Sequence, residues 1–295
     1  MMKSKLFSKS LVKTGLKILP LIFFLSACNS SVTPSFVKED ITSAVTDICK
    51  KEYQLNLVTK LVGQTLWVYM PLTDIVTKLP KPEKYTERFS VEDNKNSLSD
   101  GILKINYSIK PVEDKEITQD MSLDKKVNEK IFNVLQVIRR VLFSTDNSKI
   151  NNPLFFCIVT ADIKNGFLIK QTFHLSDLKK FSYGLISQTE YQHRIVQDTL
   201  VSALIVDDSE GIYMDYQNIT LEDFITSQIQ NRIRIKFQKP EVERNVDIDK
   251  EVLKIVTYTT NTYGFQNFNL LEMNNLVEAK KAIFNRTALS GTPKD

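Results

Sequence analysis

Two histidines and one glutamate are the best candidates for acid–base chemistry in this sequence. His174 ends a strand-like stretch, and Glu190 and His193 are three residues apart in a later segment. Residues at that spacing share one face of a helix, so Glu190 and His193 could form a carboxylate–histidine pair that transfers protons or holds a metal ion. A catalytic metal site needs about three protein ligands, which only proximity of His174 to His193 would supply. The simpler interpretation is an exposed ion pair on a solvated helix, so we predict no metal and no cofactor.

A second pattern with potential chemistry is Ser-x-x-Lys. It occurs three times beyond residue 28, at Ser35–Lys38, Ser122–Lys125 and Ser176–Lys179. In cell-wall acylating enzymes this spacing places a serine nucleophile beside a lysine on one helical turn. Each of these serines also stands where the N-cap of a helix is expected, and the companion motifs of those enzymes are missing as a set. We therefore interpret the three serines as helix caps.

The densest acidic cluster surrounds Gly211. It consists of Asp207, Asp208 and Glu210, with Asp215 shortly after. Carboxylates at this density could bind Ca²⁺, but their spacing matches no calcium-loop pattern. We interpret the cluster as a solvated turn.

The amino-terminal segment has the layout of an export signal. The apolar run Ile18–Leu25 ends in the residues Leu25-Ser26-Ala27-Cys28, and five lysines stand before it: Lys3, Lys5, Lys9, Lys13 and Lys17. The run is too short for a spanning helix, which needs about 20 apolar residues. Basic, apolar and small residues in this order are typical of a signal peptide. The segment resembles the signal peptide and lipobox of bacterial lipoprotein precursors.

This resemblance implies cleavage between Ala27 and Cys28 and acylation of Cys28, with a diacylglyceryl group on its sulfur. Two or more acyl chains make a durable membrane anchor, whereas a single chain gives only marginal binding. The polar residues up to Ser35 then form a short flexible tether. In lipoproteins sorted between two membranes, an aspartate after the cysteine favours retention at the inner one, so Asn29 favours the outer membrane where there is one. We expect a lipid-anchored protein, palmitoylated or similarly acylated, on the cell membrane or outer membrane and exposed outside the cytoplasm.

Charge is nearly balanced beyond the signal. The chain has 39 basic and 35 acidic side chains, and five of the lysines but no acid precede Cys28, which leaves 34 basic and 35 acidic ones. A nucleic-acid binder should show a basic patch or stripe, so we predict no nucleic-acid partner. Cys49 and Cys157 lie in apolar stretches, where a free cysteine usually packs as a small hydrophobe. Export would also allow a disulfide between them.

The first half of the chain predicts helices that feed hairpins. A helix after Pro34, with apolar positions from Val37 to Ile48, precedes a hairpin of residues 57–62 and 65–70. The charged, proline-containing residues 72–100 are predicted to form a mobile surface loop before a strand at 102–109. Residues 122–143 form the clearest amphipathic helix, with Phe132 on its widened apolar stripe. Strands at 154–160 and 167–174 follow it.

Three more helix starts follow. Ser187 begins a helix that continues through Ile195, Thr199 and Ala203. Thr220 begins one that ends near Gln230, before an alternating strand at 232–237. Asp247 begins the last, which ends near Gly264 before a strand at 268–271, and the polar tail after Asn285 is expected to fray.

These elements predict an α+β fold, with amphipathic helices packed on a largely antiparallel sheet built from helix–strand and hairpin units. We divide the chain into a signal peptide (1–27), the lipidated cysteine and tether (28–35), a helix–hairpin region (36–118), a main α+β region (119–285) and a polar tail (286–295).

The sequence contains no complete catalytic or phosphate-binding motif of a known type. The leading prediction is therefore a non-enzymatic structural or protein-interaction module of the cell envelope, with another envelope protein as partner. Two alternatives stay open. One is a solute-binding lipoprotein, a class usually built from two α/β lobes around a cleft. The other is an envelope hydrolase with an unrecognised site around His174 and His193.

Overall fold

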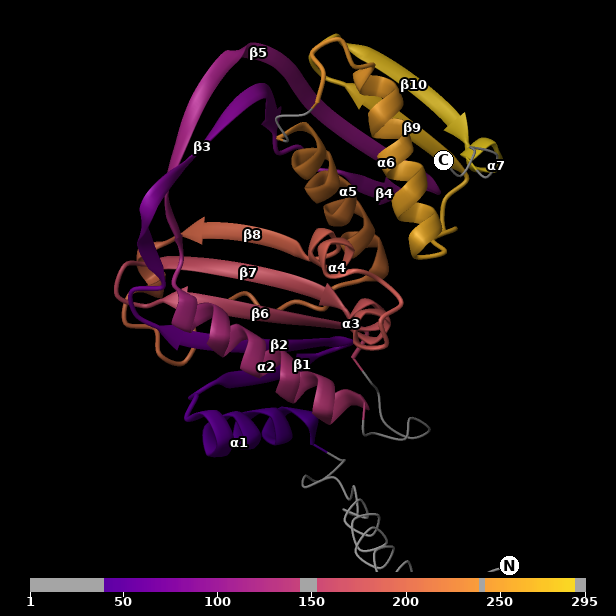
Figure 1. Ribbon diagram of the computed structural model, residues 1–295. Helices are drawn as coiled ribbons and strands as arrows, with labels where there is room; N and C mark the ends of the chain where they lie inside the picture. The colour runs from indigo at the N-terminus through magenta and orange to yellow at the C-terminus, as the bar shows by residue number, and fades with distance from the viewer. Residues whose placement is uncertain (1–39, 144–152, 239–241, 290–295) are drawn as a thin grey trace, which may run out of the picture. The chain divides into compact units, whose positions relative to one another are not determined.

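Two sheets organise the chain. A computed structural model describes residues 40–143, 153–238 and 242–289, so the predicted signal peptide, Cys28, the tether and Ser35 lie outside the described residues. Strands of both sheets alternate with helices along the chain (Figure 1). All but two of the neighbouring strand pairs are antiparallel. The predicted α+β class is confirmed.

The first sheet has the strand order β1-β2-β6-β7-β8. Its strands are β1 (Val58–Val62), β2 (Thr65–Leu72), β6 (Phe155–Asp162), β7 (Phe167–His174) and β8 (Val196–Val201). The hairpin β1–β2 and the hairpin β6–β7 were both predicted, and β2 pairs with β6 in parallel. Every residue of β6 is buried, as expected for a central strand covered on both faces.

Two helices lie against one face of this sheet. Helix α1 (Ile41–Tyr53) is capped by Asp40, whose carboxylate accepts from the backbone N–H groups of Thr42 and Ser43. Helix α2 (Lys125–Phe143) lies beside α1 (Figure 1). Most of its apolar stripe is buried as predicted, but Leu135 is only partly buried and Phe132 is 57% exposed. Phe132 is exposed because it follows the buried Ile131 and therefore points about 100° away from it around the helix.

The segment between β8 and the next long helix covers the opposite face of the first sheet. It contains the short 3₁₀ helix η1 (Ala203–Ile205), and its apolar residues pack on Trp67, Tyr69 and Cys157. The hydroxyl of Tyr69 donates to the carbonyl oxygen of Asp208 at 2.6 Å. This contact anchors a long coil on the sheet.

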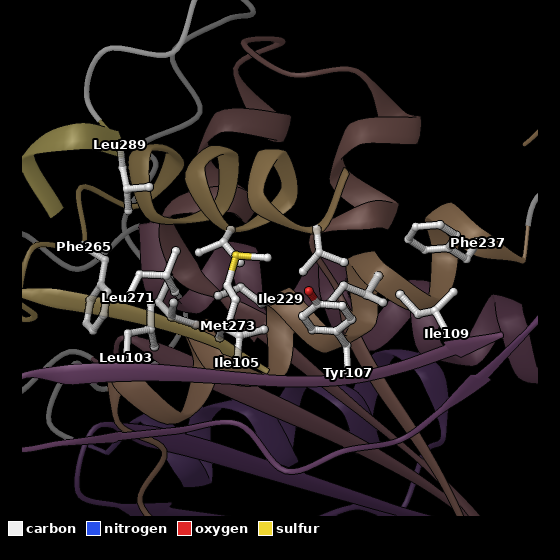
Figure 2. Packing of buried hydrophobic residues seen from close by; sticks show 14 of the residues in the cluster. Leu103, Ile105, Tyr107, Ile109, Ile229, Phe237, Phe265, Leu271, Met273 and Leu289 are labelled. Carbon is white, nitrogen blue, oxygen red and sulfur yellow. The ribbon is translucent and has the colours of Figure 1, made fainter. Parts of the chain in front are cut away.

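The second sheet has the order β10-β9-β5-β3, with β4 paired to β5. Its strands are β3 (Val76–Glu92), β4 (Ser97–Ser99), β5 (Ile102–Leu123), β9 (Leu270–Asn275) and β10 (Lys280–Asn285). Helices α5 (Leu221–Phe237) and α6 (Ile248–Thr262) pack on it. Figure 2 shows part of the resulting core, in which Ile229 of α5 lies near Ile105 and Met273 and Phe237 of α5 lies near Ile109.

Residues 72–100, predicted as a mobile loop, are mostly strand. β3 pairs antiparallel with the far half of β5, with a register shift between Lys78 and Glu83. Pro80 and Pro82 fall inside that shift, and a proline cannot donate to a ladder. The chain stays extended around them because both strands are largely exposed at this point and need no buried face. The predicted boundary between residues 118 and 119 lies inside β5.

The predicted strand at 232–237 is the second half of α5. The residues Arg232 to Phe237 alternate, which fits a strand, but Ile225, Ile229, Ile233 and Phe237 also recur every four residues. All four are buried in the core of the second sheet. Burial along the helical face decided between two periods that the sequence allows equally.

The helix predicted from Ser187 through Ala203 is also shorter than expected. Helix α4 (Gln188–His193) begins at the predicted cap Ser187 but ends after one and a half turns. Residues 196–201 then pair antiparallel with β7 as β8. Val196 is buried opposite Thr172, so tertiary pairing outweighs the weak helical pattern.

Two shorter elements complete the fold. Helix α3 (Leu175–Ser182) follows β7 directly. Helix α7 (Arg286–Leu289) corrects the prediction that everything beyond Asn285 frays, because Leu289 is buried against the core of the second sheet. No helix in the described ranges combines the length and apolar character needed to cross a membrane.

Candidate functional site

His174 acts as a helix cap. Its Nδ1 accepts from the backbone N–H of Ser176 at 3.3 Å and lies 2.6 Å from the Ser176 hydroxyl oxygen. The ring is enclosed by the aromatic rings of Phe155, Phe224 and Tyr263. An Nδ1 that accepts a backbone hydrogen bond carries no proton, so the neutral imidazole fits this position. Burial lowers the pKa of His174, with Asp177 opposing the shift.

The protein should lose stability on acidification below the ordinary histidine range because of His174. Its folded-state pKa is lowered, so below about pH 6.5 the unfolded chain binds a proton that the folded chain excludes. The contribution is complete above that pH and is lost as the pH falls toward the folded-state pKa. Thermal unfolding at about pH 7.5 and about pH 5.5 measures it.

The matched control is His174→Asn, which keeps a capping acceptor but does not titrate. The variant should lose less melting temperature between the two pH values than the original chain. Equal losses in both would show that His174 does not carry the effect.

Glu190 is the centre of a charged network. Its Oε1 accepts from Arg194 Nε at 2.7 Å, Arg232 Nη2 at 2.9 Å and the Tyr258 hydroxyl at 2.8 Å. The Arg232 guanidinium also lies over the Tyr258 ring. Burial would raise the pKa of Glu190, but the hydrogen bonds from Arg194 and Tyr258 outweigh it and lower that pKa. The carboxylate is therefore ionised, and its lowered pKa makes it a weaker proton acceptor.

The network continues to Asp177. Arg194 Nη1 donates to Asp177 Oδ1 at 2.7 Å, and the Tyr263 hydroxyl donates to Asp177 Oδ2 at 2.7 Å. The side chains of Arg194 and Asp177 are 8% and 2% exposed. Burial would lower the pKa of Arg194, but its bonds to Glu190 and Asp177 raise it instead. Two acids, two arginines and Tyr258 thus tie helices α3, α4, α5 and α6 together.

Sequence reasoning found Glu190 but missed its partners. Arg232 and Tyr258 are 42 and 68 residues away along the chain. The prediction that Glu190 belongs to an exposed ion pair is wrong, because its side chain is only 26% exposed and binds two arginines. His193 is half-buried and lines a cavity of about 290 Å³ with Arg232 and Tyr258. Within the described residues no group of three or more His, Cys, Asp or Glu side chains could hold a metal ion.

The other sequence candidates also have structural partners. The carboxylate of Asp208, from the acidic cluster, accepts from the backbone N–H groups of Ile212 and Tyr213. Cys49 and Cys157 are both buried and free, so they form no bridge. Burial raises the pKa of each thiol to about 12. A thiol with such a pKa is protonated at neutral pH and is a poor nucleophile.

A groove runs beside β8. Two cavities, of about 340 and about 620 Å³, are both lined by Asp93, Gln197, Asp198 and Arg234. The groove lies between β8, helix α5 and residues 93–96, and we call it the β8 groove. Its walls carry both signs of charge, including the ion pair of Lys170 with Asp198 at 2.8 Å. It is one of the concave sites that the described residues form.

The backbone of β8 is open toward this groove. The N–H of Ser202 donates inward to the Gly166 carbonyl, and the direction alternates along an antiparallel strand. Gln197, Thr199 and Val201 therefore direct their backbone groups away from β7. Arg234 donates to the Gln197 carbonyl at 3.1 Å. Across the described residues, no hydrogen bond engages the outward groups of Thr199 and Val201.

Exposed apolar side chains surround the open part of β8. Leu200 is 53% and Val201 79% exposed, and Leu204 in η1 is exposed as well. Single exposed apolar residues are ordinary, whereas a group beside an unpaired strand edge is typical of a contact surface. We call Thr199–Val201 with Leu204 the β8 edge site.

The chain was compared with protein-family models, with curated proteins and with solved structures. None of the three comparisons found a match.

Proposed function

We propose that this protein is a lipid-anchored lipoprotein of the cell envelope whose α+β part binds another envelope protein. The anchoring half of the proposal comes from the lysine-rich, apolar and Leu25–Cys28 segments of the sequence. The binding half rests on the β8 edge site, where unpaired backbone groups and exposed apolar side chains coincide. A partner that covers this site would form hydrogen bonds with the backbone groups and remove the apolar side chains from water.

The use of the other polar residues supports a role in binding over one in catalysis. His174 caps a helix, Oε1 of Glu190 accepts from two arginines, and the Asp208 carboxylate holds a loop. A catalytic base needs a free lone pair within reach of a substrate proton. His174 Nδ1, both carboxylate oxygens of Asp208 and Oε1 of Glu190 already accept hydrogen bonds within the fold.

Replacement of Cys28 by alanine should remove both the lipid and the membrane attachment. We expect the original chain to incorporate labelled palmitate and to stay with the membrane fraction after a high-salt wash, because two or more acyl chains bind durably. The Cys28→Ala chain should carry no label and appear in the wash. Mass spectrometry of the purified protein should find an acylated Cys28 at its amino terminus.

Cys49→Ala is the control, since it removes a buried thiol and leaves Cys28 in place. That chain should label and sediment like the original. The anchor is refuted if the original chain takes up no palmitate, or if the Cys28→Ala chain resists the salt wash.

A further inference from the structure

The free edge of β8 differs from the other sheet edges in what protects it. Strand edges are usually blocked by lysine, proline or bulges, because an unpaired edge otherwise accepts another strand. β1 carries Lys60, β10 carries Lys280 and Lys281, β3 carries two prolines in a register shift, and β4 is only three residues long. β8 reads Val-Gln-Asp-Thr-Leu-Val and has no lysine, proline or bulge. Its one charged residue, Asp198, is paired with Lys170, and α5 covers only its first half.

We propose that residues Thr199–Val201 accept an extended peptide segment of a partner protein, which adds to the first sheet as a sixth strand. This rests on the proposed function, and it names the place and the class of partner. The Thr199 and Val201 N–H and C=O groups would pair with every second residue of the peptide. Leu200 lines the β8 groove beside the charged Asp198 and Arg234, and Val201 lies on the opposite face of the strand. The peptide should therefore carry both polar and apolar side chains on its groove face and an apolar side chain beside Val201.

The geometry favours a single strand over a second folded copy. Helix α5 closes the edge at its start, where Asn231 and Arg234 donate to the carbonyl oxygens of Ile195 and Gln197. Asp93 and Arg234 line the cavity of about 620 Å³ beside Thr199 and Leu200. A second copy of this sheet would bring its own helix to the same place, and that helix would clash with the walls of this cavity.

The probes are linear peptides of twelve residues, selected by display against the full chain in detergent. Thr199→Pro removes the outward N–H without breaking the ladder to β7, because that N–H does not face β7. We expect it to weaken peptide binding by about tenfold or more, since backbone hydrogen bonds are lost and the edge is blocked. Thr199→Ala, which keeps the N–H, should bind within about threefold of the original.

N-methylation along a selected peptide gives a second readout that does not depend on any variant of this chain. Methyl groups on alternate residues should abolish binding, and those between them should have little effect, because a β-strand directs every second N–H to its neighbour. Circular dichroism establishes that Thr199→Pro remains folded. If it does not, Val201→Pro, at the next outward-facing position, takes its place.

The proposal is overturned by equal binding to Thr199→Pro and the original chain, or by N-methyl effects without alternation. It is also overturned if sedimentation shows a dimer that Thr199→Pro dissociates, since the occupant would then be a second copy. These measurements use purified protein and are independent of acylation. A failed palmitate labelling therefore removes the anchor and leaves strand addition to be judged separately.

Discussion

Replacing Arg194 with methionine should destabilise the protein by about 3–5 kcal/mol, the usual cost of removing one partner from a buried ion pair. Asp177 would remain 2% exposed, with only the Tyr263 hydroxyl as a partner. Glu190 would lose one of its donors at the same time. Urea unfolding followed by circular dichroism measures the change as a lower midpoint.

Arg244 is the matched control. It forms an ion pair with Asp114 at 2.7 Å, but both side chains are about half exposed. Arg244→Met should cost less than about 1 kcal/mol, because exposed pairs are screened by water. The double change Asp177→Leu with Arg194→Met should be more stable than Arg194→Met alone, since it leaves no unpaired buried charge. Similar costs for Arg194→Met and Arg244→Met would refute the structural role of the network.

Replacing Phe156 with alanine should cost about 3–5 kcal/mol of unfolding free energy. Phe156 is fully buried in β6, the middle strand of the first sheet, and its ring stacks on Phe173 with centroids 4.7 Å apart. Removal of the ring loses its transfer free energy and leaves a cavity that a strand paired on both sides cannot close. The same urea titration measures the effect.

Phe132→Ala makes the same chemical change at an exposed site. That ring lies on the outer face of α2 and is 57% exposed, so its removal should change stability by about 0.5 kcal/mol or less. Comparable losses at Phe132 and Phe156 would mean that the packing described for the first sheet is wrong.

The two stability predictions and the strand-addition experiment address different parts of the molecule. Arg194 and Phe156 support the frame that holds β8 in place, whereas Thr199 contributes only an outward backbone group at its edge. A substitution at Arg194 or Phe156 should reduce peptide binding because the protein unfolds. A substitution at Thr199 should reduce peptide binding without lowering the melting temperature.

The local sequence pattern alone predicts the elements whose apolar period is unambiguous. The sequence predicts the hairpin of β1 and β2, the amphipathic helix α2, the strands β6 and β7, and the start of α6 at Asp247, and the structure confirms each of them. In these segments propensity, capping residues and burial pattern favour the same structure. The amino-terminal acylation signal is also read from local order, and it stays a prediction.

Tertiary structure decided the rest, for three physical reasons. First, Arg232–Phe237 and Val196–Val201 fit either helix or strand locally, and burial against different sheets selected opposite outcomes. Second, the paired strands around Pro80 exist because β5 offers a partner from far along the chain.

Third, the charged network and the open edge of β8 are relations between segments separated by tens of residues. Glu190 could be recognised as a polar residue on a helix, but its arginines could not. No spacing along the chain encodes which donors a fold brings to one carboxylate, or which strand it leaves without a neighbour.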